Sequence, residues 1–106
     1  MNDILLIVDI SPLNRLHHLR KYINEHRQTG LTLYFINDGV QWLDSEYWET
    51  IYEPGVIYYA HAFDAVKHNI SFQADVIFSS DYTLEQLVKS KGQTVYFSCE
   101  SELSTG

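Results

Sequence analysis

A regular alternation of short apolar runs with helix-like segments constrains the fold more than any other feature of this sequence. The first run, Ile4 to Val8, is continuously apolar, which is typical of a strand buried on both faces of a parallel sheet. Four more runs follow at 31–36, 56–60, 75–79 and 94–97. This order predicts an α/β fold with three layers (α/β/α), in which helices cover both faces of a mostly parallel five-stranded sheet.

The segments between the runs have the spacing and the end signals of helices. Ser11 and Pro12 predict the start of the first helix, and Gly30 predicts its end. Residues 40–52 form a second apolar pattern of helical period, rich in aromatic side chains. Shorter helices are expected over 61–68 and from Asp81 or Thr83 to Lys89. Residues 100–106 are expected to form a polar C-terminal tail.

Composition limits the classes of protein that this chain can belong to. A length of 106 residues suits one domain, which we place at 1–99. The net charge of -7 argues against nucleic acid or an anionic membrane as a partner, and no apolar run reaches the ~18 residues of a membrane span. The single cysteine, Cys99, excludes an internal disulfide and a cysteine-based metal site. We therefore expect a soluble, cytoplasmic protein.

In open parallel sheets, ligands bind beyond the carboxyl ends of the strands, so the residues at those ends are the candidate site. The predicted ligand-binding residues are Asp9, Ser11, Asn37, Asp38, Gly39 and His61. His61 could hold an anion or act as an acid or base, and it could equally be a structural histidine. Residues 37–39 could be a turn in which Asp38 caps the next helix and Gly39 permits a close approach.

Other chemistry has weaker support in the sequence. The spacing of Asp9, Asp38 and His61 does not require a metal, so neither a metal nor a cofactor is predicted. Cys99 follows the last strand and is the second catalytic candidate, although Glu100 beside it disfavours a thiolate. The glycine-rich dinucleotide motif, the phosphate-binding loop of ATPases and the GxSxG motif are all absent from the sequence.

Three segments, in this order, resemble the DsrE/DsrF/DsrH (TusD/TusC/TusB) family of small sulfur-relay proteins. Leu33 to Val40 (LYFINDGV) is similar to the family's apolar strand followed by DGV. Gly55 to Ala62 (GVIYYAHA) is similar to its third strand and the turn that follows. Asp81 to Lys89 is similar to the helix before its last strand. The resemblance covers nearly the whole chain.

The resemblance implies a DsrE-like fold, a cytoplasmic location and assembly into oligomers such as trimers or hexamers. In the active members of the family, a cysteine after the third strand accepts persulfide sulfur. His61 occupies that position here, and an imidazole cannot carry a persulfide. The resemblance therefore implies the fold and the position of the pocket, but it does not imply sulfur transfer.

Three functions remain open from the sequence. The first is a non-catalytic subunit or small-ligand-binding protein in a homo-oligomer, or in a hetero-oligomer with related subunits. Four aromatic residues could form its contact surface or could instead be core: Trp42, Tyr47, Trp48 and Tyr52. The second is a sulfurtransferase or thiol-redox protein that uses Cys99. The third is an anion-binding or acid-base pocket built on His61 with Asp38 and Asp9.

Overall fold

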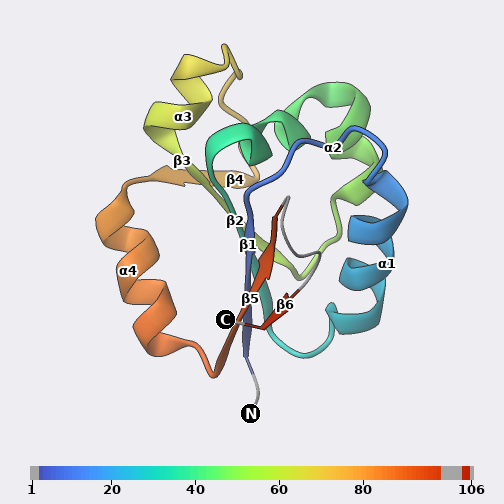
Figure 1. Ribbon diagram of the computed structural model, residues 1–106, viewed down its shortest axis with the longest axis vertical. Helices are drawn as coiled ribbons and strands as arrows, with labels where there is room; N and C mark the ends of the chain where they lie inside the picture. The colour runs from blue at the N-terminus through green and yellow to red at the C-terminus, as the bar shows by residue number, and fades with distance from the viewer. Residues whose placement is uncertain (1–2, 99–103, 106) are drawn as a thin grey trace.

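The centre of the molecule is a six-stranded sheet with the order β4-β3-β2-β1-β5-β6, shown in Figure 1. This computed structural model describes residues 3–98 and 104–105. Five strands run parallel to one another: β1 (Ile4–Val8), β2 (Leu31–Phe35), β3 (Ile57–His61), β4 (Val76–Ser79) and β5 (Gln93–Phe97). The five predicted strands and their parallel arrangement are confirmed. An additional strand of two residues, β6 (Ser104–Thr105), which the sequence did not predict, pairs antiparallel with β5 at the edge of this sheet.

Helices lie on both faces of this sheet, as the alternation predicts. They are α1 (Leu16–His26), the 3-10 helix η1 (Asn37–Leu43), α2 (Ser45–Ile51), α3 (Ala62–Lys67) and α4 (Asp81–Ser90). Figure 1 shows α1 and α2 on one side of the sheet and α4 on the other. Within the described part of the chain, no helix has both the length and the apolar character that a membrane span requires.

Two helix boundaries differ from those expected from the sequence. The first helix starts at Leu16 rather than at Ser11-Pro12, since Asn14 has a left-handed backbone (φ 62°) that an α-helix cannot contain. The single helix expected over 40–52 is two helices, with an extended Asp44 (ψ 140°) between η1 and α2.

The larger core lies between the sheet and the layer formed by α1, η1 and α2. Trp42 is completely buried there and Trp48 is 8% exposed. Tyr47 and Tyr52 are partly buried and pack against the same core. The prediction that these aromatic residues form a contact surface is therefore wrong for Trp42 and Trp48, because both rings are used inside the monomer.

The opposite face of the sheet has a smaller core, covered by one helix. Leu5, Ile7 and Tyr34 are buried beneath Leu84 and Leu87 of α4. One helix cannot cover a whole sheet face, and Ile57 and Ile77 near the β4 edge remain 48% and 50% exposed. This edge of the sheet therefore leaves apolar surface exposed to solvent.

Candidate functional site

The parallel register brings the carboxyl ends of β1 to β4 to one edge of the sheet, and polar side chains from these ends are joined there. The Asn37 side chain donates from Nδ2 to Asp9 Oδ1 at 2.9 Å, and the Asn37 backbone N–H donates to Asp64 Oδ2 at 2.7 Å. Asn37 has a positive φ of 50°, which asparagine tolerates better than most residues. Asp9 and Asn37, two predicted site residues, are therefore linked to the first turn of α3.

His61 ends β3 and is held from both sides of its ring. Its Nδ1 accepts the Asp64 backbone N–H at 3.4 Å, which caps α3, and it lies 3.5 Å from Asp64 Oδ2. Its Nε2 lies 3.0 Å from Asp81 Oδ1. Because Nδ1 acts as an acceptor, we assign the ring proton of the neutral imidazole to Nε2, from which it is donated to Asp81. The ring is thus fixed in both orientation and tautomer.

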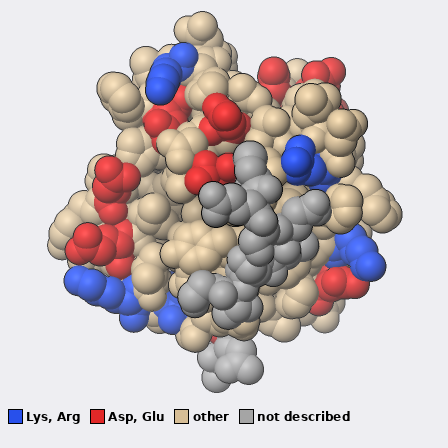
Figure 2. Space-filling view, in the orientation of Figure 1, with Lys and Arg blue, Asp and Glu red and all other residues tan. Residues whose placement is uncertain are grey.

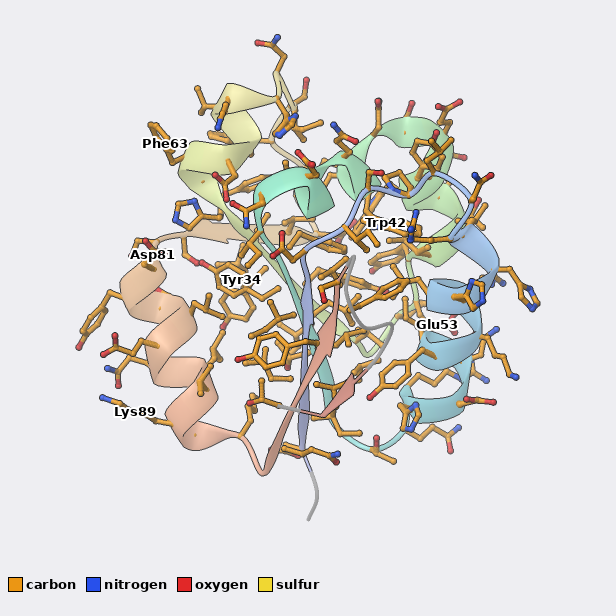
Figure 3. The ribbon with its side chains drawn as sticks, in the orientation of Figure 1. Tyr34, Trp42, Glu53, Phe63, Asp81 and Lys89 are labelled. Carbon is orange, nitrogen blue, oxygen red and sulfur yellow. The ribbon has the colours of Figure 1, made fainter. Side chains whose placement is uncertain are left out.

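An open pocket of about 670 Å³ lies beside this histidine. It is lined by residues 61–63, from the end of β3 and the start of α3, and by residues 79–83, from the end of β4 and the start of α4. Figure 3 shows Phe63 on α3 and Asp81 at the start of α4, on either side of this region. The pocket therefore lies at the carboxyl ends of two neighbouring strands, where the fold rule predicts a ligand site.

Tyr34, which is buried in the smaller core, holds two of the residues that line the pocket. Its hydroxyl donates to the Ser80 carbonyl oxygen at 2.8 Å and lies 3.0 Å from Ser79 Oγ. Burial raises the pKa of Tyr34 above its usual value of 10.0, which keeps the hydroxyl protonated as a donor. The turn from β4 into α4, and hence the position of Asp81, is anchored by this buried phenol.

The structure separates the other predicted site residues from this pocket. Asp38 pairs with His68 Nε2 at 3.3 Å, and it lies inside the first turn of η1, whose N-cap is Ile36, so the prediction that Asp38 caps this helix is wrong. Ser11 lines a smaller pocket of about 280 Å³, together with His68 and Gln41. Gly39 is buried against β1, so it offers no surface to a ligand.

Two carboxylates of the site, Asp64 and Asp81, are not among the predicted site residues, although Asp81 was expected at a strand end and at the start of a helix. Asp64 lies three residues after His61, which is the spacing of a side chain that can reach back to a helix cap, and this signal was available. Asp81 comes from a different strand end, and only the strand order places it beside His61. Cys99 lies outside the described residues. No cluster of three or more potential metal ligands occurs in the part of the chain that the structure describes.

Comparison with known proteins gives a match at the level of structure. No family model matches the sequence, and the search of curated proteins also found no match. The crystal structure of the YchN protein from E. coli is similar, with a TM-score of 0.71 over 92% of this chain and 100% of that chain. The two sequences are 15% identical, so the likeness concerns the fold alone. The protein has a DsrE-like α/β fold.

Proposed function

We propose that this protein is a non-catalytic, small-ligand-binding subunit of a cytoplasmic oligomer of the sulfur-relay type, and that its ligand site is the pocket beside His61. The observation that carries the proposal is the double restraint on the imidazole. Asp64 holds Nδ1 and Asp81 holds Nε2, at the strand end where the family resemblance would place a sulfur-accepting cysteine. A group so fixed can orient a ligand but cannot form a persulfide.

The charges beside His61 also weigh against the anion-binding version of this site. Both nitrogen atoms of the ring face carboxylates, and among the residues that the structure describes neither is paired with a lysine or arginine. An incoming anion would therefore approach two like charges at a few ångströms, which is unfavourable in a partly desolvated site. A neutral or cationic ligand suits these surroundings better.

The first experiment tests the absence of sulfur transfer at this position. The parent protein and a His61→Cys variant, both in a Cys99→Ser background, are incubated with a low-molecular-weight persulfide and examined by intact mass spectrometry. We expect the parent to keep its mass and the His61→Cys variant to gain one sulfur atom. A His61→Cys variant that keeps its mass would contradict the assignment of this position to the sulfur-accepting site of the family.

The same experiment with the native Cys99 tests the alternative activity. Sulfur transferred from the loaded native protein to an acceptor thiol would establish Cys99 as the reactive group and make the protein a sulfurtransferase. A Cys99 that stays unmodified, or that takes up sulfur without passing it on, agrees with a non-catalytic role.

Exposed apolar side chains support the oligomeric part of the proposal. Ile57 and Ile77 lie on neighbouring strands, on the same face of the sheet, and both are about half exposed. Contiguous patches of large exposed apolar side chains are found at interaction surfaces more often than elsewhere on a protein. We therefore place the subunit contact at the β4 edge, on the face that α4 leaves uncovered.

Light scattering tests the assembly and its location together. The parent is expected to form a trimer or hexamer, or to require a related subunit to do so. Ile77→Lys should shift the self-assembled species towards monomer, whereas Leu13→Lys, at a more exposed apolar position between β1 and α1, should not. A parent that stays monomeric both alone and with related subunits would contradict the oligomeric part.

A further inference from the structure

The pocket beside His61 has aromatic walls that are mostly unused by the monomer. Phe63 at the start of α3 and Tyr82 at the start of α4 both line it, and they are 72% and 70% exposed. The two rings come from different helices, and both border the same opening. An aromatic ring held at the rim of a pocket is a stacking surface for a planar or cationic group.

Asp81 gives the same pocket a carboxylate with unused hydrogen-bonding capacity. Its Oδ1 is fixed by His61 Nε2 at 3.0 Å, while the side chain as a whole is 88% exposed. The Oδ2 atom has no partner among the residues that the structure describes. The carboxylate is therefore oriented by one oxygen and is free to bind a donor through the other.

The electrostatic balance of the pocket is negative. Asp81 is the carboxylate in the lining, Asp64 lies next to His61 but outside the lining, and no lysine or arginine occurs among the described residues that line the opening. Asp81 also lies in the first turn of α4, where its own charge complements the partial positive charge of the helix end. In Figure 2 basic side chains gather at the lower left, at the far end of α4 from Asp81.

We infer that this pocket binds a small, planar organic cation with an amidinium or guanidinium head. The head donates to the Asp81 carboxylate, and its plane stacks on Phe63 or Tyr82. Guanidinium-type groups are both carboxylate partners and stacking partners, because they are flat, charged and weakly hydrated. The inference rests on the proposed ligand-binding function and names the chemical class of the ligand.

Benzamidinium chloride is the probe, because it combines the planar cationic head with an aromatic ring. Its binding to the full-length protein is measured at neutral pH by titration calorimetry and by amide chemical-shift changes. Benzamide and benzoate, which have nearly the same shape, give the neutral and anionic comparisons. We expect benzamidinium to bind most tightly and benzoate to bind least, with shifts confined to residues 61–63 and 79–83.

Variants then assign the two halves of the interaction. Asp81→Asn should weaken benzamidinium binding about tenfold or more, as expected for loss of a charge-assisted hydrogen bond. Asp75→Asn removes the same charge at the opposite end of β4 and should leave binding unchanged. Tyr82→Ala should weaken binding, and Tyr82→Phe, which keeps the ring, should restore it.

The inference and the proposed function can fail separately. Benzoate binding as tightly as benzamidinium, or an affinity unaffected by Asp81→Asn, would overturn the cation inference while the pocket remains a ligand site. Absence of benzamidinium binding at millimolar concentration would overturn it as well. The proposed function is judged independently, by the persulfide and light-scattering experiments, neither of which contains an organic cation.

Discussion

Replacement of Gly39 by alanine tests how tightly η1 is packed on the sheet. A Cβ atom at position 39 would lie 2.0 Å from the Val8 carbonyl oxygen and 2.8 Å from the Val8 carbonyl carbon. Both atoms belong to the backbone of β1, in the middle of the sheet. The same carbonyl oxygen accepts the Ile36 backbone N–H at 3.0 Å, so Val8 cannot move away without losing a hydrogen bond.

The magnitude follows from how far the backbone must move. Cβ atoms in real structures essentially never lie within 3.0 Å of such a neighbour, so η1 would have to retreat by about 1 Å. That shift would displace the fully buried Trp42, which η1 carries into the larger core. We expect Gly39→Ala to lower the free energy of unfolding by about 3 kcal/mol or more. For a domain of this size the melting temperature should fall by roughly 12 °C or more.

Urea unfolding, followed by the fluorescence of the buried tryptophans, measures this loss. Gly55→Ala is the control, because Gly55 has a positive φ of 92° and no neighbour within 4 Å of a built Cβ. It should cost only the backbone strain of about 1 kcal/mol. If Gly39→Ala costs no more than Gly55→Ala, the close approach of η1 to β1 is wrong and position 39 has another role.

Three further outcomes follow from individual polar side chains. Burial raises the pKa of Tyr58 well above 10.0, so this phenol ionises at a lower pH in the unfolded chain than in the folded protein. The free energy of unfolding should therefore fall as the pH rises above about 10. Tyr58→Phe should flatten this fall in alkaline denaturation curves. Trp42→Phe removes the 2.8 Å bond from Nε1 to the Ile10 carbonyl oxygen and should cost about 2 kcal/mol in urea unfolding, with no change in light scattering because the ring is core. Asp64→Ala leaves the Asn37 backbone N–H without its acceptor, so it should cost about 1 kcal/mol and change the imidazole ¹⁵N shifts of His61.

The sheet could be predicted because its signal is local. The run from Ile4 to Val8 is apolar at every position, and all five residues are buried, as a central strand of a parallel sheet requires. The two-residue strand β6 had no such signal. Ser104 and Thr105 are polar, and only the free edge of β5 gives their backbone groups a partner.

The error over residues 40–52 has a physical cause that periodicity does not contain. Val40, Leu43, Tyr47 and Ile51 are correctly spaced for one helix, and this spacing gave the prediction. Tertiary contacts override it, because Gly39 is fixed against Val8 and the Trp42 ring is hydrogen-bonded to Ile10 on the chain after β1. With one end of the segment fixed to β1, the chain winds as a tight 3-10 helix and restarts at Ser45.

The same tryptophans show why an aromatic excess could not locate an interface. Trp42 and Trp48 fill the larger core, whereas the exposed aromatic rings Phe63 and Tyr82 come from segments without a dense aromatic pattern. The sequence shows how many aromatic residues a segment has, but it does not show which face of the sheet lacks a covering helix. That information comes from the strand order, since within the described part of the chain α4 alone covers the smaller core and the β4 edge lies beyond it.

The site combines a predictable part with a part that only the fold supplies. His61 could be predicted, because a polar residue that ends a buried strand lies at the ligand-binding edge of a parallel sheet. Its chemical character is set by Asp81, twenty residues later, which approaches within 3.0 Å because β4 pairs with β3 and places Ser79 opposite His61. Without that pairing, His61 suggests an anion site. With that pairing, His61 orients the Asp81 carboxylate in the pocket, and the ligand that we expect there is a cation rather than an anion.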